Sequence, residues 1–130
     1  MSYKKVLVID DAAIDRLLAK KIMSKHDFAT DVHAVESAMD ALEMLRSCAS
    51  EPESLPDLIF LDINMPQMSG FDFLEEYNKF PEDVKKKCVI VMLSSSLHPE
   101  DREKALSSPY VFEFMSKPIN AEKLAKLVII

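Results

Sequence analysis

Five polar side chains stand at the ends of short apolar runs in the sequence, and together they could carry out phosphoryl chemistry. They are Asp10, Asp11, Asp62, Ser94 and Lys117. Three carboxylates held close together repel one another and raise each other's pKa. A hard divalent cation, Mg²⁺ above all, removes that conflict and leaves coordination positions for a phosphate oxygen. One carboxylate could then be the nucleophile that forms an aspartyl phosphate, in a reaction that depends mostly on positioning and charge neutralisation.

The segments that would bring these residues together are apolar runs that alternate with stretches of helical periodicity. Strands are predicted at residues 6–9, 30–35, 58–61, 89–93 and 110–115. Most of these runs are continuously apolar, which is typical of strands buried on both faces. Helices are predicted at residues 14–22, 37–45, 71–78 and 99–106, and a last one after the N-cap residue Asn120.

This alternation predicts a fold class and a place for the site. Five strands that alternate with five helices predict a parallel sheet with helices on both faces, joined by right-handed crossovers. Ligands of such sheets bind beyond the carboxyl ends of the strands, where the five polar residues would meet. The sequence has no internal repeat and no linker, so we expect residues 1–130 to form one domain.

Four local features carry expectations of their own. The helix over 14–22 has one apolar stripe, made by Ile14, Leu17, Leu18 and Ile22. The inner face of the last helix should hold Leu124, Leu127 and Val128. Three consecutive lysines at 85–87 are expected in a solvated loop. The single glycine, Gly70, is interpreted as supplying a backbone conformation that other residues resist.

The composition excludes several classes of protein. Of the 130 residues, 48% are hydrophobic and 29% are charged, so the chain can bury a core and is not disordered. The net charge of -6 and the lack of a basic stripe argue against direct nucleic-acid binding. No apolar run approaches membrane-spanning length, so no membrane partner is expected. One glycine is too few for a P-loop or a dinucleotide fingerprint. Two cysteines without motif spacing are typical of reduced thiols in a cytoplasmic protein.

Taken in order along the chain, these motifs resemble the receiver domain of bacterial two-component response regulators. The motifs are Asp10-Asp11, Asp62-Ile63-Asn64-Met65-Pro66, Gly70, Leu93-Ser94-Ser95 and Lys117-Pro118. The resemblance covers the whole chain, residues 1–130. It implies a doubly wound (βα)5 flavodoxin-like fold, which is a three-layer sandwich around a five-stranded parallel sheet with the strand order 2-1-3-4-5.

The resemblance also implies which residues accept the phosphoryl group and hold the metal. Asp62 would be the phosphoacceptor. Asp11, Asp62 and the backbone carbonyl of Asn64 would bind Mg²⁺ directly, whereas Asp10 would act through a metal-bound water. Lys117 would pair with the phosphoryl oxygens as a compact point charge.

A further pair of residues is implied as the switch that reports phosphorylation. Ser94 would donate a hydrogen bond to a phosphoryl oxygen, and it stands where threonine is more frequent in the family. Phe114 matches the aromatic switch position, although it lacks the hydroxyl of a tyrosine. The Lys117-Pro118 peptide bond would be cis, since an X-Pro bond is the type for which cis is accessible.

The function that this resemblance implies is that of a signalling phosphoacceptor. A histidine kinase or a histidine phosphotransfer protein would donate the phosphoryl group to Asp62. A downstream protein target would then bind the face built from the fourth helix, the fifth strand and the fifth helix, after a shift between two conformations. The domain would promote only its own phosphorylation and dephosphorylation, so it would not be an enzyme with a separate substrate.

Two alternative functions remain open at this point. The first is a phosphatase or phosphotransferase with an aspartate nucleophile, although Asn64 stands where the best-known family of that kind has its general acid. The second is a docking module that works without phosphorylation. That module usually lacks part of the acidic set, whereas the set in this sequence is complete.

Overall fold

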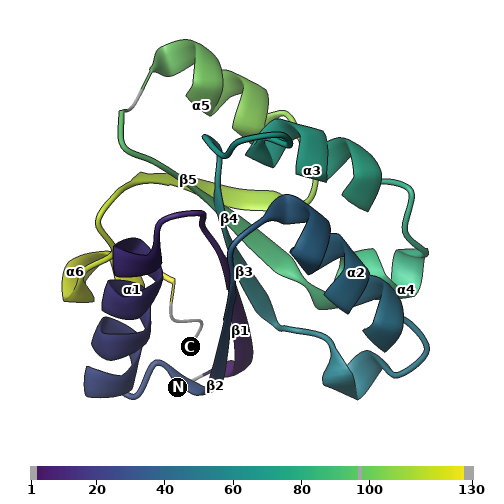
Figure 1. Cartoon of the computed structure of the whole chain (residues 1–130), viewed down its shortest axis with the longest axis horizontal. Coiled ribbons are helices and arrows are strands. Elements are labelled where there is room, and N and C mark those ends of the chain that lie inside the picture. The colour runs from purple at the N-terminus through teal and green to yellow at the C-terminus, as the bar shows by residue number, and fades with distance from the viewer. Residues whose placement is uncertain (1–2, 97, 128–130) are drawn as a thin grey trace.

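The predicted parallel sheet is present, and its strands lie in the predicted order. The computed structural model describes residues 3–96 and 98–127, and its strands form one sheet in the order β2-β1-β3-β4-β5 (Figure 1). The strands are β1 (Tyr3–Ile9), β2 (Ala29–Val35), β3 (Leu58–Asp62), β4 (Val89–Ser94) and β5 (Val111–Ser116). Each neighbouring pair is parallel. The flavodoxin-like fold expected from the sequence is therefore confirmed.

Helices cover both faces of the sheet and complete the three layers. They are α1 (Ala13–Lys25), α2 (Ala38–Cys48), the 3-10 helix η1 (Pro52–Ser54), α3 (Gly70–Tyr77), α4 (Glu82–Lys87), α5 (Pro99–Leu106) and α6 (Ala121–Ala125). α1 and α6 lie on one face, and α2 to α5 lie on the other (Figure 1). Alternate residues of β1 serve the two cores, because Val6 and Val8 face α1 and α6 whereas Leu7 and Ile9 face the other side. Within the described residues, no helix combines the length and apolarity that crossing a membrane requires.

Side-chain caps fix where three of the helices begin. The hydroxyl of Ser37 accepts the backbone N–H of Asp40 at 3.1 Å, at the predicted start of α2. Asn120 caps α6 in the same way, as expected. At α3, Ser69 and Asp72 form a reciprocal capping box. The first residue of α3, Gly70, donates its backbone N–H to the carbonyl of Ile63 in the loop that follows Asp62.

One helix was not expected, because residues 85–87 were predicted to lie in a loop. They form the last turn of α4 instead. Charge explains the helix: Glu82 and Asp83 lie in its first turn and the three lysines in its last, which is the order that the helix dipole favours. Within this helix, Val84 is buried, and Lys87 forms an ion pair with Asp57 at 2.7 Å. The predicted fourth and fifth helices are therefore α5 and α6.

Three of the four residues in the apolar stripe of α1 face outward, contrary to expectation, whereas Ile22 packs against the core. Ile14, Leu17 and Leu18 are 61%, 49% and 48% exposed. The helix instead packs against the sheet through Ala19 and Met23. A small alanine lets the helix backbone approach the strands closely, so the buried face is narrower than the periodicity of the larger residues suggests. Leu124 of α6 and Leu127, in the turn after α6, are buried as predicted, whereas Val128 lies outside the described residues.

Candidate functional site

Three carboxylates meet at the carboxyl end of the sheet, where the sequence predicted them. β1 and β3 are neighbours paired through Ile9 and Leu61, so the residues that follow or end these strands lie side by side. Ligand oxygens of Asp10, Asp11 and Asp62 lie within 4.8 Å of one another. Asp10 and Asp62 are each only 3% exposed, whereas Asp11 is exposed.

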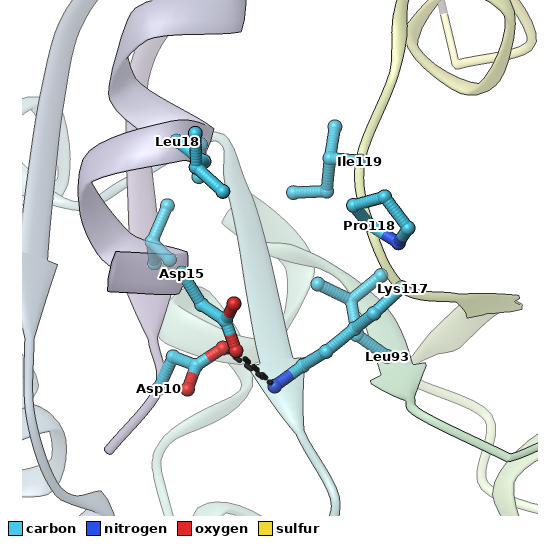
Figure 2. Close-up of a pocket in the computed structure, with 9 residues that line it drawn as sticks. Asp10, Asp15, Leu18, Leu93, Lys117, Pro118 and Ile119 are labelled. Atoms are coloured by element: carbon cyan, nitrogen blue, oxygen red, sulfur yellow. Dashed lines mark hydrogen bonds and ion pairs between the residues drawn. The ribbon is translucent and has the colours of Figure 1, made fainter. Parts of the chain in front are cut away.

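The ammonium group of Lys117 lies among carboxylates. Its Nζ is 2.8 Å from Asp10 Oδ2 and 3.0 Å from Asp62 Oδ2. A third carboxylate, that of Asp15 in the first turn of α1, lies 3.1 Å away (Figure 2). Asp15 was not predicted as a site residue. Its sequence signal is an acid one helical turn after Asp11, on a helix that begins at the site.

Two sets of hydrogen bonds hold Lys117 in this place. Its backbone N–H donates to the carbonyl of Ser94 at 2.8 Å, which extends the pairing of β4 and β5 by one residue. The ammonium of Lys123 in α6 then donates to the carbonyl and hydroxyl of Ser116 and to the carbonyl of Pro118, at 2.7, 2.9 and 2.9 Å. The Lys117-Pro118 peptide bond is cis, as expected.

The electrostatics of the site favour an added cation. Burial raises the pKa of Asp62, and its hydrogen bonds to Lys117 and to the Asn64 N–H offset this only in part. Burial opposes the charged form of Lys117, but hydrogen bonds to Asp10, Asp62 and Asp15 outweigh it and raise the lysine pKa. One ammonium thus faces more carboxylate charge than it can balance. Oxygen ligands at this spacing suit a hard divalent cation, so the residues fit Mg²⁺.

The backbone around the carboxylates is held by short-range hydrogen bonds. Asp62 Oδ1 accepts the N–H of Asn64 at 3.1 Å, and Asp10 Oδ1 accepts the N–H of Ala12 at 3.0 Å. Arg16 donates to the Asp10 carbonyl at 2.7 Å. The carboxylates of Asp10 and Asp62 are therefore each oriented by their own loop. Asn64, whose carbonyl the sequence predicted as a metal ligand, lies in the loop directly after β3.

Gly70 is required for space and not for an unusual backbone angle. It does not have a positive φ, which corrects the expectation from the sequence. Its N–H donates to the Ile63 carbonyl at 3.0 Å. A Cβ atom at this position would lie 2.7 Å from the Asp62 carbonyl oxygen and 2.8 Å from Ile63 Cα. The glycine allows α3 to begin in direct contact with the backbone of the predicted phosphoacceptor.

The two predicted switch residues lie next to the site but are directed elsewhere. Ser94 ends β4 and is fully buried. Its hydroxyl donates to the Ser96 carbonyl and accepts the Ser96 N–H, so these bonds stay within the turn after β4. Phe114 is buried in the core beneath α5, and Arg102 of α5 donates to its carbonyl at 3.3 Å.

Comparisons with known proteins agree with this geometry. The sequence model of the response regulator receiver domain matches residues 6–129. The two-component response regulator ORR12 of Oryza sativa subsp. japonica is 33% identical over 128 residues, which cover 98% of each chain. Protein-glutamate methylesterase/protein-glutamine glutaminase 3 of Burkholderia thailandensis is 35% identical over 116 residues, and the match spans 88% of this chain but 29% of that protein.

Solved structures show the same architecture. A two-component response regulator from Cytophaga hutchinsonii superposes with a TM-score of 0.91 at 31% identity, covering 98% of this chain and 95% of the other. The receiver domain of the histidine kinase CKI1 from Arabidopsis thaliana superposes with a TM-score of 0.69 at 25% identity, covering 85% and 80%. That receiver domain was crystallised in complex with Mg²⁺ and BeF3⁻.

Proposed function

The chain belongs to the family of response regulator receiver domains, and from that premise we propose that it is a signalling phosphoacceptor whose acceptor residue is Asp62. The observation that carries this proposal is the position of the Asp62 carboxylate. It is buried at the end of β3, bonded to Lys117 and within ligand distance of Asp10 and Asp11. A histidine kinase or a histidine phosphotransfer protein is the donor that this family membership supports.

In the transfer step, a carboxylate oxygen of Asp62 attacks the phosphorus atom of a phosphohistidine. The phosphorus–nitrogen bond breaks, and the imidazole nitrogen keeps the electron pair. Lys117 is already within hydrogen-bond distance of the attacking carboxylate, so it can follow the negative charge onto the phosphoryl oxygens. Burial of Asp62 favours this chemistry, because the acyl phosphate is formed where little water surrounds it.

Asp11, Asp62 and the Asn64 carbonyl would hold Mg²⁺ directly, and Asp10 would hold it through water. When bound, Mg²⁺ supplies positive charge that neutralises the carboxylates and the transferring phosphoryl oxygens. The need for such charge follows from the excess of carboxylates around the ammonium of Lys117.

The signal would leave the site through Ser94 and Phe114. We propose that the Ser94 hydroxyl exchanges its partner in Ser96 for a phosphoryl oxygen and that the ring of Phe114 repacks with it. The surface that would change is the face of α5, β5 and α6. Leu106 and Phe112 are exposed apolar residues of α5 and β5, which suits docking of a downstream protein. We also propose that residues 1–130 form one receiver domain that acts in the cytoplasm, on its own phosphorylation state and not on a separate substrate.

Intact mass after incubation with Mg²⁺ and acetyl phosphate tests the proposal. The wild type should gain one phosphoryl group, and Asp62→Ala should gain none. Asp83→Ala is the matched control, because Asp83 is an exposed acid of α4 outside the site, and it should behave as the wild type. An adduct of equal yield in Asp62→Ala would refute the assignment of Asp62.

Binding of beryllofluoride distinguishes a receiver that hydrolyses its phosphoryl group quickly from a docking module that works without phosphorylation. Fast hydrolysis could hide the adduct in a functional receiver, but that receiver would still bind beryllofluoride in the presence of Mg²⁺. If neither the adduct nor the complex forms, the docking module without phosphorylation becomes the better account. Release of inorganic phosphate from a phosphomonoester, lost in Asp62→Ala, would favour the phosphatase.

A further inference from the structure

Lys117 has a carboxylate partner that does not belong to the predicted metal group. Two of its partners, Asp10 and Asp62, are members of the acidic cluster that fits Mg²⁺. The other, Asp15, projects from the first turn of α1 toward the same ammonium (Figure 2). The side chain of Asp15 is 37% exposed, compared with 4% for each of the other two carboxylates. Asp15 and Pro118 both line the pocket shown in Figure 2.

An ammonium group has three N–H donors and no acceptor. Lys117 donates hydrogen bonds to Asp62 and Asp15 at 3.0 and 3.1 Å and forms an ion pair with Asp10 at 2.8 Å. A phosphoryl oxygen on Asp62 would therefore compete with these carboxylates for the ammonium of Lys117. Asp15 has the longest of the three contacts and the most exposed side chain. Of the three carboxylates, Asp15 can give up its contact with Lys117 at the least cost, because water can solvate its exposed side chain instead.

We propose that Asp15 is a positioning residue that retains Lys117 in the resting site and competes with the phosphoryl group for it. This inference rests on the proposed function, because it assumes that Asp62 carries the phosphoryl group. It adds to that function a fourth carboxylate, contributed by α1, that opposes the phosphorylated state.

The negative charge of Asp15 should act in opposite directions on the two ligands of the site. It attracts a cation, so it should strengthen Mg²⁺ binding. It occupies Lys117 and repels an anion, so it should weaken binding of a phosphoryl group or of its analogue beryllofluoride. A residue that only supported the fold would affect both ligands in the same direction.

Asp15→Asn tests this competition, because it removes the charge and keeps the size of the side chain. Two affinities should be measured by calorimetry: that of Mg²⁺ alone, and that of beryllofluoride at saturating Mg²⁺. We expect Asp15→Asn to bind beryllofluoride about threefold more tightly and Mg²⁺ about threefold more weakly. A change of this size corresponds to the loss of one partly exposed ion pair. Asp15→Glu restores the charge and should return both affinities toward those of the wild type.

Asp83→Asn is the matched control. It makes the same change of charge at an exposed acid in the first turn of a helix, but α4 precedes β4 and so lies at the opposite end of the sheet from the site. Both affinities should stay at their wild-type values in this variant.

The outcomes separate the inference from the function on which it rests. Tighter beryllofluoride binding with weaker Mg²⁺ binding in Asp15→Asn, reversed by Asp15→Glu, supports the competition. If Asp15→Asn binds both ligands more weakly, or neither affinity changes while the wild type binds both, the inference is wrong and the proposed function stands. If the wild type itself binds no beryllofluoride with Mg²⁺ present, the proposed function fails and the inference fails with it.

Discussion

Replacing Gly70 by alanine tests whether α3 has to touch the backbone that carries Asp62. The added Cβ would lie 2.7 Å from the Asp62 carbonyl oxygen and 2.8 Å from Ile63 Cα. Ordinary contacts begin at 3.4 Å, so the start of α3 and the end of β3 would have to separate by about 0.7 Å, the difference between 2.7 and 3.4 Å. The methyl group of Met92, 3.1 Å away, can move aside more easily.

Two effects of this substitution oppose each other. Alanine restricts the unfolded chain, which favours the folded state by about 0.4–1 kcal/mol where the native geometry accepts it. Overpacking a filled site costs about 1–3 kcal/mol, and here the atoms that must move are held in place. The Ile63 N–H donates to the Leu93 carbonyl, and the Gly70 N–H donates to the Ile63 carbonyl, both at 3.0 Å. The clash should therefore dominate, with a net loss of about 1–2 kcal/mol and a fall in Tm of roughly 5 °C.

The assay is thermal and urea unfolding followed by circular dichroism, together with the affinity for Mg²⁺. Because the displaced atoms include the Asp62 carbonyl, Gly70→Ala should weaken Mg²⁺ binding as well as stability. Ser69→Ala is the matched control, since it removes the cap of the same helix and should lower stability by about 1 kcal/mol without changing Mg²⁺ binding. If Gly70→Ala is as stable as the wild type and binds Mg²⁺ equally well, the close-contact argument is refuted.

Three further predictions concern the charges of the site. Burial raises the pKa of Asp62, so ionisation of this carboxyl group lowers the stability of the folded protein at pH values above its folded-state pKa. Asp62→Asn should therefore raise Tm at pH 7. This gain in Tm should shrink as the pH falls toward about 4, the ordinary pKa of aspartate. A constant gain at all pH values would contradict this. Added Mg²⁺ should raise the Tm of the wild type. At a concentration 100-fold above its Kd, binding adds about 2.7 kcal/mol to the free energy of unfolding. Asp11→Asn should lose most of that gain, and an undiminished gain would argue against Asp11 as a ligand. Lys123→Ala should lower the free energy of unfolding by about 1–2 kcal/mol, because the ammonium holds the loop that carries Lys117; unchanged urea unfolding would show that these bonds contribute little.

The sheet and the position of the acidic cluster could be predicted because their signals are local. A run such as Val6–Ile9 is continuously apolar and ends in aspartate, so the strand and its functional end are visible together. The rule that ligands bind beyond the carboxyl ends of parallel strands then brought Asp10, Asp62 and Lys117 to one place. The contact of Asp15 with Lys117 could not be found in this way, because it depends on how α1 is rotated about its axis.

That rotation is also where the sequence was misleading. The larger apolar residues of α1, such as Ile14 and Leu17, suggest one buried face, but the helix packs through Ala19 and Met23, with Ile22 beside them as the one stripe residue against the core. Periodicity shows that a stripe exists, whereas close packing against the sheet decides which stripe is buried. The helix α4 was missed for a related reason, since Val84 is its sole buried residue and no apolar period marks it. Its charge order, with acids first and lysines last, was the usable signal.

The distance along the chain between Asp62 and Lys117 has a consequence for the synthesis of the protein. The two residues are 55 positions apart, which a ribosome covers in roughly 3 to 11 s at about 5–20 residues per second. β5, the strand that delivers Lys117, is the edge strand beside β4 and the last to be made. During that interval Asp10, Asp11 and Asp62 lack the ammonium of Lys117, and their repulsion opposes the closure of β1 against β3. We expect Mg²⁺ in the surrounding solution to help the nascent chain hold β1 and β3 together until Lys117 has been synthesised.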